Sequence, residues 1–194
     1  MSEHWKFLDE VHDYKRLPLD NIPEVIFWGR SNVGKSSLIN SITKSKIAKT
    51  SKTPGRTRSL IFFQLENKLR LVDFPGYGFS KIPKNNEYKL DILIDEYLKK
   101  RKSIFKLFLL IDSKHGFKET DNLIINQLDK YLHERVYLVF TKTDRLKNLD
   151  EKSLLENHNK IANDKFNKNF FNTSIKEINT IILLKKFLMD SLGK

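Results

Sequence analysis

The segment GRSNVGKS, residues 29–36, has the spacing of a phosphate-binding loop, G-x-x-x-x-G-K-S. Its glycines allow the backbone to fold around a phosphate, and successive N–H groups at the start of a helix then supply a partial positive field. Lys35 can reach the β- and γ-phosphates of a nucleotide, and the Ser36 hydroxyl is a hard oxygen ligand for Mg²⁺. A chance glycine-rich turn is the alternative, and the loop alone does not choose between ATP and GTP.

The segment DFPG, residues 73–76, follows the apolar run LRLV. Asp73 at a strand end beside a phosphate-binding loop can hold Mg²⁺ through water, and Gly76 can offer its backbone N–H to a γ-phosphate. Phe74 and Pro75 complete the segment. An ordinary Pro-Gly turn is the alternative, and the position at the end of a strand favours the nucleotide site.

The segment TKTD, residues 141–144, follows the apolar run RVYLVF. The Asp144 carboxylate can accept hydrogen bonds from the N1–H and the exocyclic amine of guanine, and adenine has no such pair of donors. The stem of Lys142, which lies between Thr141 and Thr143, can pack over the base. A strand-end turn or a helix cap is the alternative, but as the third motif in the correct order the segment predicts guanine selectivity.

Asn172, Thr173 and Ser174 end the last predicted strand, where a backbone N–H could bind the guanine O6. The residues from Ser174 to Glu177 also fit a capping box, S-x-x-E, for the last helix. Both interpretations stay open.

The apolar runs around these motifs predict strands alternating with helices, and hence a three-layer α/β fold. The expected sheet is six-stranded and mostly parallel, with one antiparallel edge strand from a hairpin of residues 59–65 and 69–74. Residues 1–22, with a short helical segment, are predicted to be an N-terminal extension packed on a single domain formed by residues 23–194. The remaining strands are predicted at 24–28, 104–112, 135–140 and 169–174, and the helices at 35–43, 87–101, 120–134, 150–162 and 176–192.

The composition favours a soluble cytoplasmic protein. The chain has no cysteine, which excludes disulfides, thiol catalysis and cysteine metal sites. It has no apolar stretch long enough to span a bilayer, and its five histidines show no metal-ligand spacing. The net charge of +12 is consistent with an RNA partner, but most of the 36 basic residues are lysines, which the codon bias of an AT-rich genome would also produce.

Taken together, GRSNVGKSSLIN, TSKTPGRT, DFPGYGFSK and TKTD resemble the small Ras-like GTPases and, more narrowly, the bacterial EngB family of ribosome-assembly GTPases. PGRT followed by D-x-PGYG is much more specific than a phosphate-binding loop alone. The resemblance implies a Ras-like P-loop GTPase fold, binding of GTP and GDP, and dependence on Mg²⁺. It also implies association with the large ribosomal subunit, through rRNA and ribosomal proteins, and a link to cell division and septation. We expect a monomer with no membrane partner.

The resemblance also implies roles for individual residues. Lys35 and Thr57 are implied as catalytic residues, and Ser36 and Thr57 as Mg²⁺ ligands, with Asp73 acting through water. Thr50 and Thr53 lie in the same loop as Thr57, and only the family pattern singles Thr57 out. The implied GTP contacts are Gly29, Arg30, Ser31, Asn32, Val33, Gly34, Lys35, Ser36, Gly55, Arg56, Thr57, Arg58, Ser59, Asp73, Phe74, Pro75, Gly76, Thr141, Lys142, Thr143, Asp144, Asn172, Thr173 and Ser174.

Thr141 replaces the commoner Asn of the N-K-x-D motif, as is usual in this family, and the segment NTSI at residues 172–175 lacks the typical small Ala. Three further residues bear on hydrolysis or on the phosphate-binding loop. Tyr77 occupies the place of the water-positioning glutamine, and a phenol cannot do the job of that amide, so we expect slow hydrolysis without a ribosomal partner. Asn32 is a candidate K⁺ ligand, and its alternative role is to stabilise the loop. Trp28, directly before Gly29, is bulkier than expected.

Two other classes of function stay open. An ATP-dependent kinase or ATPase would use the phosphate-binding loop but would leave TKTD and PGRT unexplained. An RNA-binding protein with a vestigial nucleotide site would bind RNA with an affinity that is independent of GTP and steeply dependent on salt.

Overall fold

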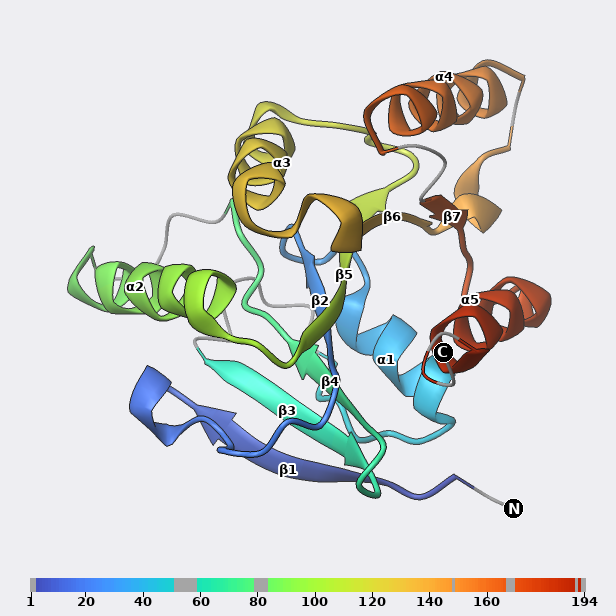
Figure 1. Cartoon of the computed structure of the whole chain (residues 1–194). Helices are drawn as coiled ribbons and strands as arrows, with labels where there is room; N and C mark the ends of the chain where they lie inside the picture. The colour runs from blue at the N-terminus through green and yellow to red at the C-terminus, as the bar shows by residue number, and fades with distance from the viewer. Residues whose placement is uncertain are drawn as a thin grey trace.

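The computed structural model describes residues 3–50, 59–78, 84–147, 149–166, 170–190 and 192. Within these ranges the strands and helices alternate along most of the chain (Figure 1). The strands are β1 (Trp5–Val11), β2 (Glu24–Gly29), β3 (Leu60–Leu65), β4 (Leu69–Asp73), β5 (Ile104–Asp112), β6 (Val136–Thr141) and β7 (Phe170–Asn172). The helices are α1 (Lys35–Thr43), α2 (Lys84–Lys100), α3 (Glu119–Leu132), α4 (Leu149–Phe166) and α5 (Ile178–Asp190), with 3-10 turns η1 (Tyr14–Arg16), η2 (His133–Arg135) and η3 (Thr143–Arg145).

All seven strands belong to one mixed sheet with the order β1-β3-β4-β2-β5-β6-β7. From β4 to β7 every neighbouring pair is parallel, and β3 runs antiparallel to both β4 and β1. The parallel strands β2, β5 and β6 are nearly continuous apolar runs because both of their faces are covered. Their carboxyl ends meet at one edge of the sheet, which brings the motifs that follow them together.

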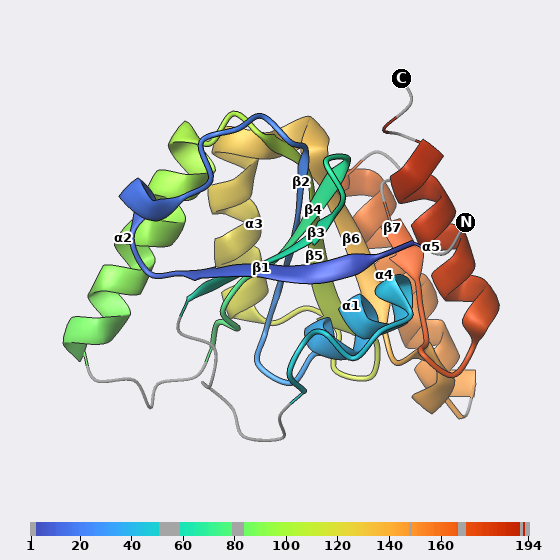
Figure 2. The ribbon, with the colours of Figure 1, turned by 90° about the horizontal axis from the view of Figure 1, so that it is seen from below.

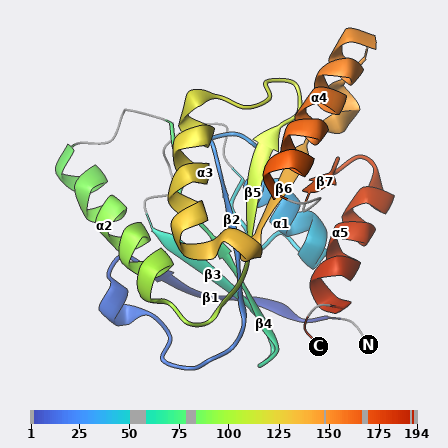
Figure 3. The same ribbon diagram turned by 45° about the horizontal axis from the view of Figure 1, so that its top comes forward.

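The two faces of the sheet are covered by different helices, as Figure 2 shows: α2 and α3 lie on one side and α1 and α5 on the other. Alternate residues of β2 serve the two layers. Ile26 and Trp28 belong to the core under α2 and α3, whereas Val25 and Phe27 belong to the core under α1 and α5. Figure 3 shows α2 and α3 side by side on their face. The predicted three-layer fold is therefore confirmed.

The number of strands and the structure of the N-terminal segment differ from the sequence-based expectation. The sheet has seven strands rather than six, because β1 pairs with β3 in a segment for which a short helix was predicted. The hairpin of β3 and β4 is present as predicted, but β1 covers β3 and takes the edge position. A bulge between Phe7 and Asp9 interrupts the alternation of β1, so its local pattern does not resemble a strand.

The described residues contain no helix that is both long and apolar enough to cross a membrane.

Candidate nucleotide-binding site

The phosphate-binding loop connects β2 to α1 in a conformation that its residues permit. Asn32 and Gly34 both have positive φ angles, of 64° and 113°. At Gly29, a Cβ atom would lie 2.7 Å from the carbonyl oxygen of Leu110 in β5, so the strand can pass this point only without a side chain. Helix α1 starts directly after Gly34 with no side-chain cap on its first turn. Its first amide groups therefore have no partner within the helix and can bind an anion.

Lys35, Ser36 and Asp73 lie together at the start of α1 and the end of β4. The Ser36 hydroxyl is 3.4 Å from Asp73 Oδ2, a long hydrogen bond. Asp73 is buried, and its Oδ1 has no hydrogen-bond partner among the described residues. Burial raises the pKa of Asp73, although the nearby Lys35 ammonium and the Ser36 hydroxyl oppose this shift. Burial also lowers the pKa of Lys35, and the Asp73 carboxylate opposes that shift.

This donor set fits Mg²⁺. A hydroxyl and a carboxylate are the hard oxygen donors that Mg²⁺ prefers. An unpartnered buried carboxylate oxygen is costly unless a cation or a water completes it, and Asp73 Oδ1 is such an atom. No cluster of three or more His, Cys, Asp or Glu side chains suited to a metal occurs in the part of the chain that the structure describes. Among the described residues, Ser36 and Asp73 are therefore the side chains at this site that offer hard oxygen atoms to Mg²⁺.

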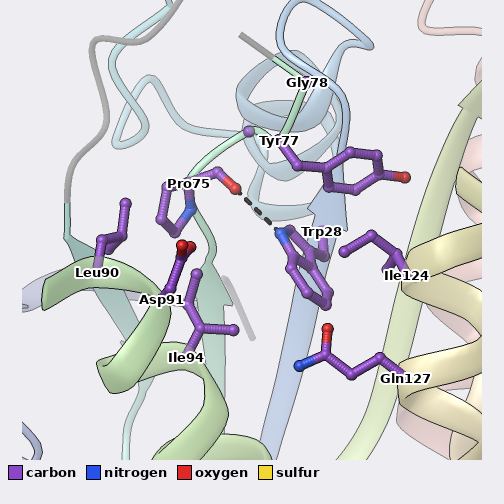
Figure 4. A pocket seen from close by; sticks show the side chains of 10 residues that line it. Trp28, Pro75, Tyr77, Gly78, Leu90, Asp91, Ile94, Ile124 and Gln127 are labelled. Carbon is purple, nitrogen blue, oxygen red and sulfur yellow. Dashed lines mark hydrogen bonds between the residues drawn. The ribbon is translucent and has the colours of Figure 1, made fainter. Parts of the chain in front are cut away.

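The corner after β4 lies directly on the phosphate-binding loop. A Cβ atom on Gly76 would come within 2.9 Å of the backbone N and the Oγ of Ser31. The Ser31 N–H donates to the carbonyl oxygen of Tyr77 at 3.3 Å. The indole N–H of Trp28 donates to the Pro75 carbonyl oxygen at 3.0 Å, as Figure 4 shows. The bulky Trp28 that departs from expectation is therefore one of the supports of this corner.

Arg30, a predicted nucleotide contact, directs its guanidinium elsewhere. Its Nη2 donates to the Gly116 carbonyl oxygen at 2.7 Å, and its Nε lies 3.3 Å from Asp121 Oδ1 in α3. These contacts tie the loop to the segment between β5 and α3. The backbone of Arg30 stays in the phosphate-binding loop, where its carbonyl oxygen accepts the Val33 N–H at 3.2 Å.

Thr141 and Lys142 join the end of β6 to the phosphate-binding loop. The Thr141 hydroxyl donates to the Val33 carbonyl oxygen at 2.7 Å, and Lys142 Nζ donates to the Asn32 carbonyl oxygen at the same distance. Lys142 Nζ also pairs with Asp112 Oδ2 at 2.6 Å. Asp112 was not singled out from the sequence, although an acidic residue that ends a buried strand was an available signal. These bonds fix the TKTD loop beside the phosphate site.

Asp144 and Ser174 come together from different strands. The Ser174 hydroxyl donates to Asp144 Oδ1 at 2.7 Å, and Lys176 Nζ lies 3.0 Å from Asp144 Oδ2. The Ser174 hydrogen bond lowers the pKa of Asp144, and Lys176 contributes to the same shift. Thr143 N–H donates to the Thr173 carbonyl oxygen at 3.3 Å, which joins the two loops further. The TKTD segment and residues 172–174 are thus joined by hydrogen bonds, and the Asp144 carboxylate between them is ionised at neutral pH.

The capping box proposed for Ser174 and Glu177 is not formed. Helix α5 begins later, at Ile178, and the Ser174 N–H donates to the Thr180 hydroxyl rather than to Glu177. Ser174 Oγ instead accepts from the Lys176 N–H at 3.1 Å while it donates to Asp144. The Ser174 hydroxyl therefore binds Asp144 of the TKTD segment, and the Thr180 hydroxyl accepts the Ser174 N–H before α5 begins.

The remaining predicted residues are placed less centrally or lie outside the description. Asn172 is exposed at the end of β7, and Asn32 is exposed in the phosphate-binding loop. Ser59 is buried at the start of β3, where its hydroxyl donates to Glu10 of β1 at 2.6 Å. Gly55, Arg56, Thr57 and Arg58 lie outside the described residues.

Comparison with known proteins gives consistent results. Residues 24–142 match the family model described as "50S ribosome-binding GTPase". A probable GTP-binding protein EngB of Mycoplasmopsis synoviae is 44% identical over 151 residues, which cover 78% of this chain and 80% of that protein. A probable EngB of Rickettsia bellii is 44% identical over 160 residues, which cover 81% of this chain and 74% of that protein.

Solved structures show the same fold. The crystal structure of a probable GTP-binding protein EngB superposes with a TM-score of 0.65 at 25% identity, covering 88% of this chain and 98% of that one. Era of Aquifex aeolicus, bound to GDP and AlF₄⁻, gives a TM-score of 0.68 at 22% identity, covering 88% of this chain and 57% of that one. At that identity the second match speaks for the fold alone.

Proposed function

Because this chain belongs to the EngB family of GTP-binding proteins, we propose that it is a GTPase switch in the assembly of the large ribosomal subunit, with a role in cell division and septation. Membership of the family supports binding of guanine nucleotides and hydrolysis of GTP, and we propose Mg²⁺ as the metal that this chain uses. The observation that carries the ribosomal part is the match of residues 24–142 to a family described as ribosome-binding. The net charge of +12 supports a partner rich in RNA.

In the proposed complex the nucleotide extends from the N-terminus of α1 to Asp144. The loop amides and Lys35 bind the phosphates, and the ionised Asp144 carboxylate accepts the two guanine donors. Ser174 holds one oxygen of Asp144, and the exposed Lys176 can leave the other oxygen to the base because its ion pair is open to solvent. The backbone of Thr173 and Ser174 lies beside this carboxylate and is the proposed partner of the guanine O6, with Asn172 next to it.

Hydrolysis is proposed to occur by in-line attack of water on the γ-phosphate. Lys35 and the loop amides stabilise the negative charge that develops on the phosphate oxygens. Ser36 and Thr57, with Asp73 through water, would hold Mg²⁺, which would supply positive charge to neutralise the phosphates. Tyr77 offers no amide to orient the water, so we propose slow turnover in the absence of the ribosomal partner.

We also propose Asn32 as a K⁺ ligand, because this residue is exposed in the phosphate-binding loop and carries an amide oxygen. Hydrolysis rates measured in K⁺ and in Na⁺, with and without ribosomes, test this assignment, and equal rates in all conditions would reject it.

We further propose that the protein acts as a cytoplasmic monomer. Residues 23–194 are proposed as the GTPase domain and residues 1–22 as its N-terminal extension. Its proposed partners are the rRNA and proteins of the large subunit.

Co-sedimentation with purified large subunits tests the ribosomal role. The chain is mixed with subunits in GDP or in a non-hydrolysable GTP analogue and centrifuged through a sucrose cushion. We expect more chain in the pellet with the analogue than with GDP. Equal sedimentation in both nucleotides would contradict the switch, and no sedimentation in either would contradict ribosome binding.

A further inference from the structure

The corner at Gly76 is held by two aromatic side chains, Trp28 and Tyr77, that are not among the predicted nucleotide contacts. On one side, the Trp28 indole donates to the Pro75 carbonyl oxygen at 3.0 Å. On the other, the Tyr77 hydroxyl donates to Asp121 Oδ1 at 2.7 Å. Figure 4 shows the Tyr77 ring above Trp28 with its hydroxyl directed toward the side of α3. The two rings pack edge to face with their centroids 5.6 Å apart.

Asp121 is a rigid acceptor for this hydroxyl. It is fully buried in the first turn of α3, where its Oδ2 accepts the Lys118 N–H at 2.7 Å. The Arg30 guanidinium lies 3.3 Å from Oδ1 and provides the opposite charge. Burial and the Asp121 carboxylate both raise the pKa of Tyr77, so the phenol stays protonated and donates. A hydrogen bond to a charged, buried acceptor is among the stronger ones in a protein.

We propose that Tyr77 is a positioning residue for GTP hydrolysis: through its hydrogen bond to Asp121 it holds Gly76 against the phosphate-binding loop. This inference rests on the proposed GTPase mechanism, in which the Gly76 N–H meets the γ-phosphate. Glycine has more backbone freedom than any other residue, so a corner built on Gly76 needs external supports to stay in place. At the position where other switches carry a water-positioning glutamine, Tyr77 therefore anchors the corner to α3.

Removal of the Tyr77 hydroxyl alone tests whether Tyr77 positions Gly76. Tyr77→Phe keeps the ring on Trp28 and loses the bond to Asp121. We expect the affinity for a non-hydrolysable GTP analogue to fall roughly tenfold, as the loss of one charge-assisted hydrogen bond gives, and kcat to fall with it. GDP affinity should stay within about twofold, because the contacts to the β-phosphate come from the loop amides and not from Gly76.

Tyr97→Phe is the matched control. Tyr97 is also buried, and its hydroxyl donates to the Glu24 carboxylate at 2.5 Å, far along β2 from Gly29. This variant loses the same kind of bond and should lower stability without changing the ratio of the affinities for the GTP analogue and GDP. An equal change of that ratio in both variants would overturn the positioning role.

Trp28 reports on the corner independently of activity. The chain has two tryptophans, so Trp5→Phe leaves Trp28 as the only one, and excitation at a wavelength that tyrosine does not absorb reports on it alone. Trp28 is 3% exposed in the supported corner. In this background Tyr77→Phe should raise the quenching of Trp28 by acrylamide, and Tyr97→Phe should not. Unchanged quenching would mean that the hydroxyl does not hold the corner.

Asp121→Asn tests the other end of the bond, because it keeps the shape of the side chain and removes its charge. We expect Asp121→Asn, like Tyr77→Phe, to lower the affinity for the GTP analogue and kcat. The double variant should lose less binding free energy for the analogue than the sum of the two single variants, because both remove the same hydrogen bond. If the unaltered chain neither binds nor hydrolyses GTP, the proposed function is wrong. If it does both and Tyr77→Phe behaves identically, only the positioning role is overturned.

Discussion

The start of β2 is held by a buried cluster of charges, and its disruption should have a large effect on stability. Glu24 is fully buried and accepts hydrogen bonds from Tyr97 Oη at 2.5 Å and from Arg101 Nε at 2.8 Å. Arg101 Nη2 donates to its second carboxylate oxygen, and Arg70 Nη1 lies 3.6 Å from that oxygen. We therefore consider Glu24→Gln, which keeps the volume and removes the charge.

The expected loss of stability follows from the groups that stay behind. The amide can accept through one oxygen only, and its NH₂ group would face the guanidinium of Arg101. Arg101 is itself largely buried and bonds both oxygens of Glu24, and a buried charge that loses its partner costs about 3–5 kcal/mol. Arg70 would keep its two hydrogen bonds to Asp20. Since domains are stable by about 5–15 kcal/mol, the variant should unfold much more easily.

Urea denaturation followed by circular dichroism measures the effect. With a slope of about 2 kcal/mol/M, the midpoint should fall by roughly 1.5–2.5 M with the slope unchanged. Asp95→Asn is the control, because it also converts a carboxylate to an amide but breaks only the exposed pair with Lys99; its midpoint should hardly move.

A loss below about 1 kcal/mol for Glu24→Gln would refute the reasoning, because it would mean that the buried Arg101 does not depend on this carboxylate. Nucleotide affinity of the folded protein should stay unchanged, since the cluster lies at the opposite end of β2 from Gly29.

Three further perturbations have defined outcomes. Asp144→Asn should lower the affinity for GDP about 100-fold or more in calorimetry, since a site built for guanine donors rejects a mismatch strongly, and an unchanged preference for GDP over ADP would contradict the assignment. Burial lowers the pKa of His158 from its usual 6.5. Protonation of this histidine therefore favours the unfolded chain, so the free energy of unfolding should be highest above about pH 6.5 and should fall below it. His158→Gln should flatten that pH dependence in thermal melts. Gly29→Ala should destabilise the fold by about 1–3 kcal/mol because its Cβ would lie 2.7 Å from the backbone oxygen of Leu110, and an unchanged melting temperature would show that the strands can separate at this point.

The features that local sequence determines were predictable. The buried strands β2, β5 and β6 could be recognised because parallel strands with two covered faces are continuous apolar runs. The order of the motifs along the chain then placed them at one edge of the sheet. For the same reason the meeting of Asp144 with residues 172–174 could be anticipated, since both follow parallel neighbours β6 and β7.

The features that depend on contacts between distant residues were not predictable. Nothing near Tyr77 in the sequence indicates a bond to Asp121, because that contact exists only once α3 has packed on the sheet. The direction of the Arg30 guanidinium depends on the same packing. The strand β1 forms because it pairs with β3. Its bulge between Phe7 and Asp9 interrupts the alternation by which a strand is recognised in a sequence.

The pairing of β1 with β3 also bears on the solubility of the chain. The sequence of β3, LIFFQL, is apolar and β-prone, and an uncovered strand of this kind recruits strands from other molecules. The edge that β1 presents in its place carries Lys6, Asp9 and Glu10 and is bent by a bulge, which are the features that discourage such recruitment. A chain shortened to residues 23–194 would keep every nucleotide motif and yet expose this strand. The first residues of the chain, which contain none of those motifs, therefore cover an edge that would otherwise be open to pairing with strands of other molecules.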